Sequence, residues 1–130
     1  MNQIIRKNPK TVPTPVGDYS HVTVIPPNST LYTFSGQIGI DSNGEIPLSH
    51  QKQVENTFKN IEKVLASENL TEKNITKVNV WSVEEINWDH FYAIWQHFFV
   101  VNPSMTIAYV SALGLPEIKI EIEIFAAKPE

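Results

Sequence analysis

Two glutamates near the C-terminus have the residue type and the spacing that acid–base chemistry requires. Glu121 and Glu123 alternate with isoleucines at positions 118, 120, 122 and 124. Residues two apart on a strand project from the same face of a sheet, so we expect the two carboxylates to lie side by side. Each is either a solvated strand charge or a general acid/base whose pKa rises when a second subunit closes over it and excludes water.

Other residue groups that could support catalysis have unsuitable spacing. Of the 4 histidines, only His90 and His97 share a predicted helix, and the chain has no cysteine. Seven residues span roughly 10 Å along a helix, which one metal ion cannot bridge, so we interpret the histidines as surface residues. The segment Gly36-Gln37-Ile38-Gly39 lacks the third glycine of a dinucleotide loop, and no Gly-x-Ser-x-Gly turn presents Ser35 as a nucleophile. We therefore expect no metal ion and no cofactor.

The charge distribution limits the kinds of partner. The chain has 10 Lys+Arg against 14 Asp+Glu, a formal charge of -4, and no Lys or Arg lies between Lys77 and Lys119. Binding to a nucleic-acid backbone depends on Lys and Arg side chains that neutralise phosphates, so we do not expect nucleic acid as the main partner. The stretch without cations also offers nothing to hold an anionic substrate group.

Length and composition predict one globular domain over residues 1–130. The chain is 42% hydrophobic and 18% charged, which is typical of a folded protein. It contains no apolar run of about twenty residues that could span a membrane, and its N-terminus lacks the apolar core of a secretory signal. We expect a cytoplasmic protein with no membrane partner.

Hydrophobic periodicity predicts two helices among several strands. The first helix starts at Ser49 and the second follows residues 84–87, each with one apolar stripe. The stripes consist of Val54, Phe58, Ile61 and Leu65 in the first helix, and of Phe91, Ile94 or Trp95, and Phe98 in the second. Strands are predicted at residues 21–25, 31–40, 75–83, 105–112 and 118–124, with a further strand at residues 3–6. The turn at residues 26–29 is expected to join the strands at 21–25 and 31–40 into a hairpin.

These elements predict an α+β fold in which two helices pack on one face of a β-sheet. The other face of the sheet stays bare, and the strand at residues 31–40 is apolar on both sides. Soluble monomers rarely expose an apolar patch of that size. We therefore expect the chain to associate with copies of itself.

Several motifs resemble the YjgF/RidA family across nearly the whole chain. They are GDYSH at residues 17–21, LYTFSGQIGID at 31–41 with GE at 44–45, and LP at 115–116 with KIEIE at 119–123. The resemblance implies a chorismate-mutase-like fold and a homotrimer whose sheets pack around a central barrel, with a ligand cleft at each subunit interface. Active members of that family hydrolyse enamines and imines, such as 2-aminoacrylate, to ketoacids and ammonia.

The resemblance also implies which residues form the cleft. The catalytic positions of the family fall on Tyr19, Ser35 and Glu121, and Gly36 of the same motif is a further binding residue. The arginine that holds the substrate carboxylate in the family falls on Met105, whose thioether donates no hydrogen bond. The cleft asparagine falls on Tyr92 and the residue two after the arginine on Ile107, so the implied cleft is more apolar at all three positions.

Three functional hypotheses remain open from the sequence. The first is a Rid-family homotrimer whose cleft binds a small neutral or apolar molecule, with or without hydrolysis through Glu121. The second is an enamine/imine deaminase, a hydrolase of C=N bonds, in which Arg6 or Lys119 replaces the lost arginine. The third is a non-enzymatic binding or chaperone-like trimer that works through its surface.

Overall fold

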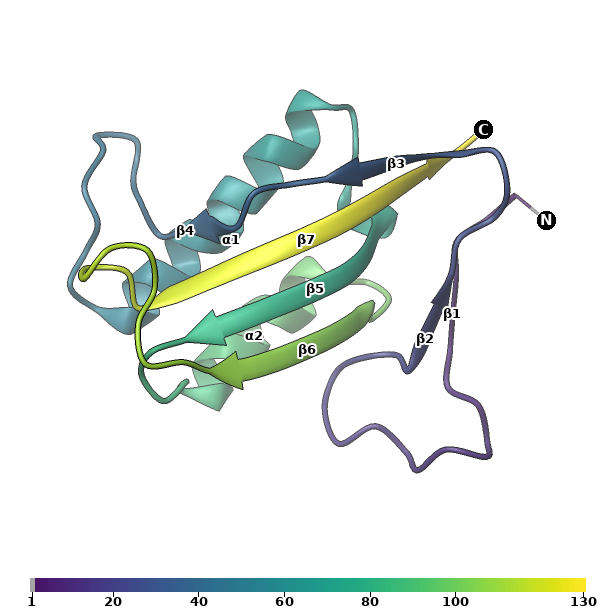
Figure 1. Cartoon of the computed structure of the whole chain (residues 1–130), viewed down its shortest axis with the longest axis horizontal. Helices are drawn as coiled ribbons and strands as arrows, with labels where there is room; N and C mark the ends of the chain where they lie inside the picture. The colour runs from purple at the N-terminus through teal and green to yellow at the C-terminus, as the bar shows by residue number, and fades with distance from the viewer. Residues whose placement is uncertain (1) are drawn as a thin grey trace.

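The structure is a computed structural model that describes residues 2–130. Its main sheet has five strands in the order β3-β7-β5-β6, and β4 also pairs with β7. The pair β5–β6 is parallel and the other pairs are antiparallel. The elements in chain order are β1 (Ile5–Lys7), β2 (Val22–Val24), β3 (Ser29–Thr33), β4 (Gln37–Ile38), α1 (His50–Ser67), a short 3-10 turn η1 (Glu72–Asn74), β5 (Ile75–Ser82), α2 (Trp88–Phe98), β6 (Ser104–Tyr109) and β7 (Ile120–Pro129) (Figure 1).

Both predicted helices are confirmed, and each begins at a side-chain cap. The Ser49 side chain accepts a hydrogen bond from the Lys52 N–H at the start of α1, and Asn87 accepts one from the His90 N–H at the start of α2. Such caps satisfy amide groups that have no partner inside the helix. The apolar stripe of each helix faces the sheet. The two helices contact each other through aromatic rings, and the ring centroids of Phe58 in α1 and Phe91 in α2 are 5.9 Å apart.

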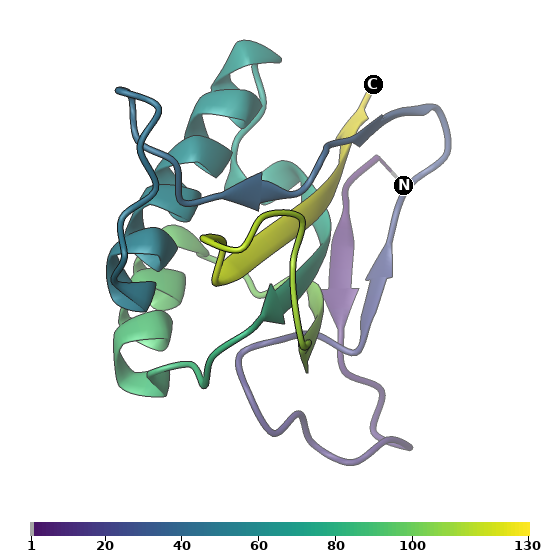
Figure 2. The same ribbon diagram turned by 60° about the vertical axis from the view of Figure 1, so that its left-hand side comes forward.

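The two helices cover one face of the sheet, as predicted. Figures 1 and 2 show them together on one side, with the strands of the main sheet in front of them in Figure 1. In β7, Ile120, Ile122 and Ile124 are buried at 0%, 0% and 1% exposure, whereas Glu121 and Glu123 are only half-buried. The isoleucines thus face the helices, and the glutamates share the opposite face.

The predicted hairpin between residues 21–25 and 31–40 is wrong. Strand β2 pairs instead with the N-terminal strand β1, as Ile5 opposite Val24, in a separate two-stranded sheet. Strand β3 pairs with β7. The prolines at 26 and 27 have no N–H to donate to a ladder next to the turn, so a hairpin here is poorly supported. Figure 2 shows the β1–β2 ribbon on the side of the sheet away from the helices.

The predicted strand at residues 31–40 is interrupted in its middle. Two short strands, β3 and β4, flank Phe34, Ser35 and Gly36, and both pair with β7. A side chain at position 36 would overlap the carboxylate of Glu121, so glycine allows Glu121 to pack here without moving its side chain. The interruption therefore places Ser35 and Gly36 beside Glu121.

Gly39 is a second position where the fold leaves no room for a side chain. Substitution of this residue tests the packing of β4 against α1. A Cβ atom at 39 would lie 2.5 Å from the Cα atom of Gln53 in α1. Because backbone must move to relieve that overlap, we expect Gly39→Ala to lower the free energy of unfolding by about 1–3 kcal/mol in urea denaturation. Gly114→Ala is the matched control, since nothing lies within 4 Å of its Cβ position. Equal stability of the two variants would contradict the described packing.

Candidate functional site

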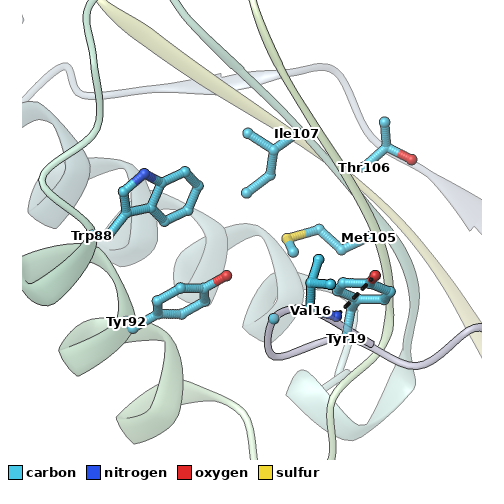
Figure 3. Close-up of a pocket in the computed structure, with 8 residues that line it drawn as sticks. Val16, Tyr19, Trp88, Tyr92, Met105, Thr106 and Ile107 are labelled. Carbon is cyan, nitrogen blue, oxygen red and sulfur yellow. Dashed lines mark hydrogen bonds between the residues drawn. The ribbon is translucent and has the colours of Figure 1, made fainter. Parts of the chain in front are cut away.

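A cavity of about 570 Å³ lies between the start of α2, strand β6 and the loop that precedes β2 (Figure 3). We call it the aromatic pocket, because three of its lining residues are Tyr or Trp and none carries a formal charge. Its volume is in the range of small-molecule sites. The lining residues are Val16, Gly17, Tyr19, Trp88, Tyr92, Met105, Thr106 and Ile107.

Helix α2 supplies one wall of the aromatic pocket. Trp88 and Tyr92 are four residues apart, hence on one helix face, and their rings stack with centroids 5.4 Å apart. Partial burial raises the pKa of the Tyr92 phenol. A hydrogen bond from the Asp18 backbone lowers this pKa, whereas the negative charge of Asp18 raises it. Tyr92 is therefore a neutral phenol at physiological pH.

The loop before β2 supplies the opposite wall. Figure 3 shows the Tyr19 ring across the pocket from Trp88 and Tyr92, and the Tyr19 hydroxyl accepts a hydrogen bond of 3.3 Å from the Val16 N–H. A Cβ at position 17 would lie 2.6 Å from the Tyr92 hydroxyl, so glycine lets this loop approach Tyr92 without displacing its side chain. Gln96 of α2 donates to the Asp18 carboxylate at 2.8 Å and ties this loop to the helix.

Strand β6 forms the floor of the aromatic pocket. Met105 lies opposite Val78 of β5, and Ile107 lies opposite Val80, so both point to the face that the helices cover. Thr106 projects from the other face, and Figure 3 shows its hydroxyl pointing away from Met105 and Ile107. The structure thus brings together four of the seven residues that sequence comparison with the family suggested: Tyr19, Tyr92, Met105 and Ile107.

The other three candidates, Ser35, Gly36 and Glu121, form a separate group that we call the glutamate group. Glu121 lies opposite Ile38 of β4 and Trp81 of β5, and its carboxylate packs against Gly36. Ser35 is exposed beside Gly36, and its carbonyl accepts a hydrogen bond of 3.0 Å from Gln37. None of the three lines the aromatic pocket.

The aromatic pocket and the glutamate group lie on opposite faces of the sheet in one chain. Strand β5 separates β6 from β7, so the two strands are about 10 Å apart. Met105 and Ile107 point toward the helices, whereas Glu121 points away from them. Within one chain Glu121 therefore cannot reach a molecule that is bound beside Met105.

Arg6 and Lys119, the two cations that were expected to replace the arginine of the family, have other partners in the structure. Arg6 donates to the backbone carbonyls of Lys73 and Ile75 at 2.6 and 2.7 Å, and Lys119 forms an ion pair of 3.2 Å with Glu84. Lys77 comes nearer, because its ammonium group donates to the Thr106 hydroxyl at 2.9 Å. That hydroxyl points away from Met105, so the Lys77 ammonium also lies on the face opposite the pocket.

Two histidines are more buried than we predicted, and both serve as hydrogen-bond partners. His50 bonds the buried hydroxyl of Ser82 at 2.8 Å, and its burial lowers its pKa. His90 bonds Glu55 at 3.0 Å, which lowers the pKa of that carboxyl. Over residues 2–130, no three His, Asp or Glu side chains converge into a group that could hold a metal ion. None of the helices in the same range is both long and apolar enough to cross a membrane.

Sequence reasoning missed Trp88, which forms much of the helix wall of the pocket. Trp88 is 36% exposed although it is one of the largest apolar side chains of the chain. Its position four residues before Tyr92 was a usable signal, since residues at that spacing lie together on a helix. Val16 was missed as well, because nothing in the sequence shows that the loop before β2 folds against α2.

Comparison of the sequence with known proteins identifies a matching family model and several relatives of similar length. The protein-family model described as Endoribonuclease L-PSP matches residues 9–128. A RutC family protein of Aquifex aeolicus is 33% identical over 126 residues, which cover 94% of this chain and 97% of the relative. The mitochondrial protein MMF1 of Saccharomyces cerevisiae is 29% identical, over 92% of this chain and 81% of that protein.

Solved structures show the same fold. YyfB of Yersinia pestis, a Rid-family protein of unknown function, matches with a TM-score of 0.83 and 25% identity over 97% of this chain and 98% of that one. Escherichia coli TdcF, solved with bound serine, matches with a TM-score of 0.69 and 22% identity over 95% and 98% of the two chains. The length of the family match and the identity to the RutC family protein together show that this chain belongs to the YjgF/RidA family.

Proposed function

We propose that the protein is a Rid-family homotrimer whose intersubunit cleft binds a small neutral or apolar molecule. In this proposal, the aromatic pocket of one subunit and the glutamate group of its neighbour line the same cleft. Glu121 is the acid/base if the bound molecule is hydrolysed, and Tyr19 and Ser35 orient it. The protein lacks the cation that a 2-imino acid would need at position 105.

One observation carries the choice of ligand class: the lining of the aromatic pocket has no charged side chain. A carboxylate taken from water into such a site loses its hydration and gains no charged donor, which is costly. Met105 occupies the position where family resemblance places the arginine, and it offers only a thioether. The pocket can instead bury an apolar body and give hydrogen bonds from the Tyr19 and Tyr92 hydroxyls.

The separation of the two groups within one chain supports the intersubunit cleft. Glu121 is half-buried on a face that the helices leave uncovered, and Trp81, Glu123 and Phe125 share that face. A neighbouring subunit packed there would cover these aromatic rings and bring its own pocket to the carboxylate. In a cyclic trimer, each of the three interfaces then joins the aromatic pocket of one subunit to the glutamate group of its neighbour, so one assembly contains three equal clefts.

The deaminase alternative has less support. It needs a cation at the substrate carboxylate, but Arg6 and Lys119 are both committed to other partners. The endoribonuclease activity in the description of the family model also lacks support from charge, since the chain carries a net -4. The chaperone-like alternative remains a hypothesis. It differs from the proposal in that it does not require a small molecule to bind in the aromatic pocket, which the assay below measures.

The proposal predicts that the protein binds N-phenyl-1-naphthylamine, a neutral probe that fluoresces when it leaves water. We expect a saturable rise in fluorescence with one probe for each subunit, and light scattering that gives the mass of a trimer. Ile107→Asp places a carboxylate in the pocket and should weaken probe binding by about tenfold or more, because the charge must be desolvated. Ser67→Asp is the control, since Ser67 is exposed at the end of α1 and does not line the pocket.

Two results would contradict the proposal. A monomeric mass would remove the intersubunit cleft, and equal probe binding by the two aspartate variants would place the probe outside the pocket. The deaminase alternative is tested separately with a threonine or serine dehydratase that releases an enamine. Faster ketoacid formation on addition of the unchanged protein would establish that activity in place of the proposed one.

A further inference from the structure

Most of the aromatic pocket comes from an acidic part of the chain. Residues 78–118 contain no Lys or Arg, yet this stretch supplies α2, β6 and five of the eight lining residues. The same stretch contains Glu84, Glu85, Asp89 and Glu117, of which Glu84 is paired with Lys119 at 3.2 Å. The stretch therefore brings to the pocket no cation that would repel a positively charged ligand.

Asp18 adds a carboxylate close to the pocket itself. It follows the lining residue Gly17, its charge acts on the Tyr92 phenol, and Gln96 holds its carboxylate at 2.8 Å. One hydrogen bond from a neutral amide leaves the negative charge of Asp18 in place. The wall formed by Tyr92 is thus backed by an anion whose position is fixed.

The lining has the composition of a site for a methylated cation. Trp88 and Tyr92 lie on one side of the pocket and Tyr19 on the other, with the polarizable thioether of Met105 between them (Figure 3). The electron-rich faces of Trp and Tyr attract cations, and quaternary ammonium groups are bound by cages of such rings. A methylated ammonium presents apolar methyl groups, so it needs no hydrogen-bond acceptor in the pocket.

We infer that the aromatic pocket binds an organic cation, specifically a molecule with a methylated ammonium group placed between Trp88, Tyr92 and Tyr19. The inference rests on the proposed small-molecule site and extends its ligand class from neutral molecules to cations. The ammonium group of Lys77 bonds the Thr106 hydroxyl on the other face of the sheet. It does not occupy the space between the rings.

The test compares choline with 3,3-dimethylbutan-1-ol, its neutral carbon isostere, by isothermal titration calorimetry. The two probes have the same shape, so their difference in affinity reports the charge alone. We expect choline to bind about three- to thirtyfold tighter, the range of cation–π contacts from exposed to desolvated sites. Trp88→Leu keeps an apolar wall and should remove most of that difference while binding of the isostere changes little. Tyr92→Leu repeats the test at a second ring if the first variant does not fold.

Each outcome decides the inference. Tighter binding of choline that depends on Trp88 or Tyr92 supports it. Equal or tighter binding of the neutral isostere overturns the cationic class and leaves the proposed neutral site in place. No binding of either probe also overturns the inference; in that case, saturable binding of N-phenyl-1-naphthylamine shows that the proposed function survives, and its absence shows that both fail.

Discussion

Met105→Arg is expected to give the protein an affinity for small carboxylates that the unchanged chain lacks. Position 105 points into the aromatic pocket, and the described lining has no charge that would pair with the new guanidinium in advance. An arginine can give a carboxylate two charge-assisted hydrogen bonds, each of about 1.5–3 kcal/mol, so the gain in affinity should be about a hundredfold or more. Pyruvate is a suitable stable probe, measured by calorimetry.

Two control variants separate the paired hydrogen bonds of arginine from a general effect of charge. Ser67→Arg places the same group at the exposed end of α1, outside the pocket lining, and should leave pyruvate binding unchanged. Met105→Lys provides a point charge without the paired donors, so its gain should be smaller than that of arginine. A folded Met105→Arg protein that binds pyruvate no better than Ser67→Arg would show that position 105 does not face the ligand.

The same variant tests how much of the catalytic apparatus of the family is present. If Glu121, Ser35 and Tyr19 are otherwise competent, Met105→Arg should also accelerate ketoacid release in the coupled dehydratase assay. A variant that binds pyruvate but stays inactive would locate the missing part beyond the carboxylate anchor. Pyruvate binding therefore reports the carboxylate anchor, and ketoacid release reports the remaining catalytic residues.

Most elements of the fold could be predicted from the sequence because their signals are local. Val54, Phe58, Ile61 and Leu65 recur at helical spacing, and all four are buried in α1. The alternation of isoleucine and glutamate in β7 likewise assigned each side chain to the correct face. In both cases the period of the apolar residues carries the information, and it needs no knowledge of the partner element.

Strand pairing was less predictable because it depends on residues far apart in the chain. Strand β2 pairs with β1 across the proline-rich loop, so the turn at residues 26–29 does not make the hairpin that its composition suggested. At the interruption, Gly36 packs against Glu121, which lies more than eighty residues later. No local pattern reports such a contact, and the glycine alone was compatible with a continuous strand.

The candidate site was predicted in part. Family resemblance supplied Tyr19, Tyr92, Met105 and Ile107, and the structure places all four around one cavity. The resemblance did not point to Trp88; its helical spacing from Tyr92 shows only that the two share a helix face, because the pocket itself is completed by a loop about seventy residues earlier that folds against α2. The structure also shows the glutamate group on the opposite face, a separation that no sequence pattern could reveal.

The proposed cleft predicts a covalent link between subunits that one chain cannot make within itself. The native chain has no cysteine, so Met105→Cys with Glu121→Cys introduces the only two thiols. Within one chain, the two positions lie on opposite faces of the sheet and two strands apart, about 10 Å at least. If position 105 of one subunit faces position 121 of its neighbour, a short bis-maleimide should convert most of the protein into covalent dimers and trimers on a denaturing gel.

The control variants decide whether such a product reports the cleft. Each single-cysteine variant should stay mainly monomeric under the same conditions, because like positions in a cyclic trimer do not meet at one interface. Met105→Cys with Ser42→Cys keeps the number of thiols but moves one to the exposed turn before α1. Equal cross-linking of this control would indicate random collision between subunits. Monomers that carry an internal link, identified by mass, would show that the two halves of the site meet within one chain, and the proposed cleft between subunits would then have no basis.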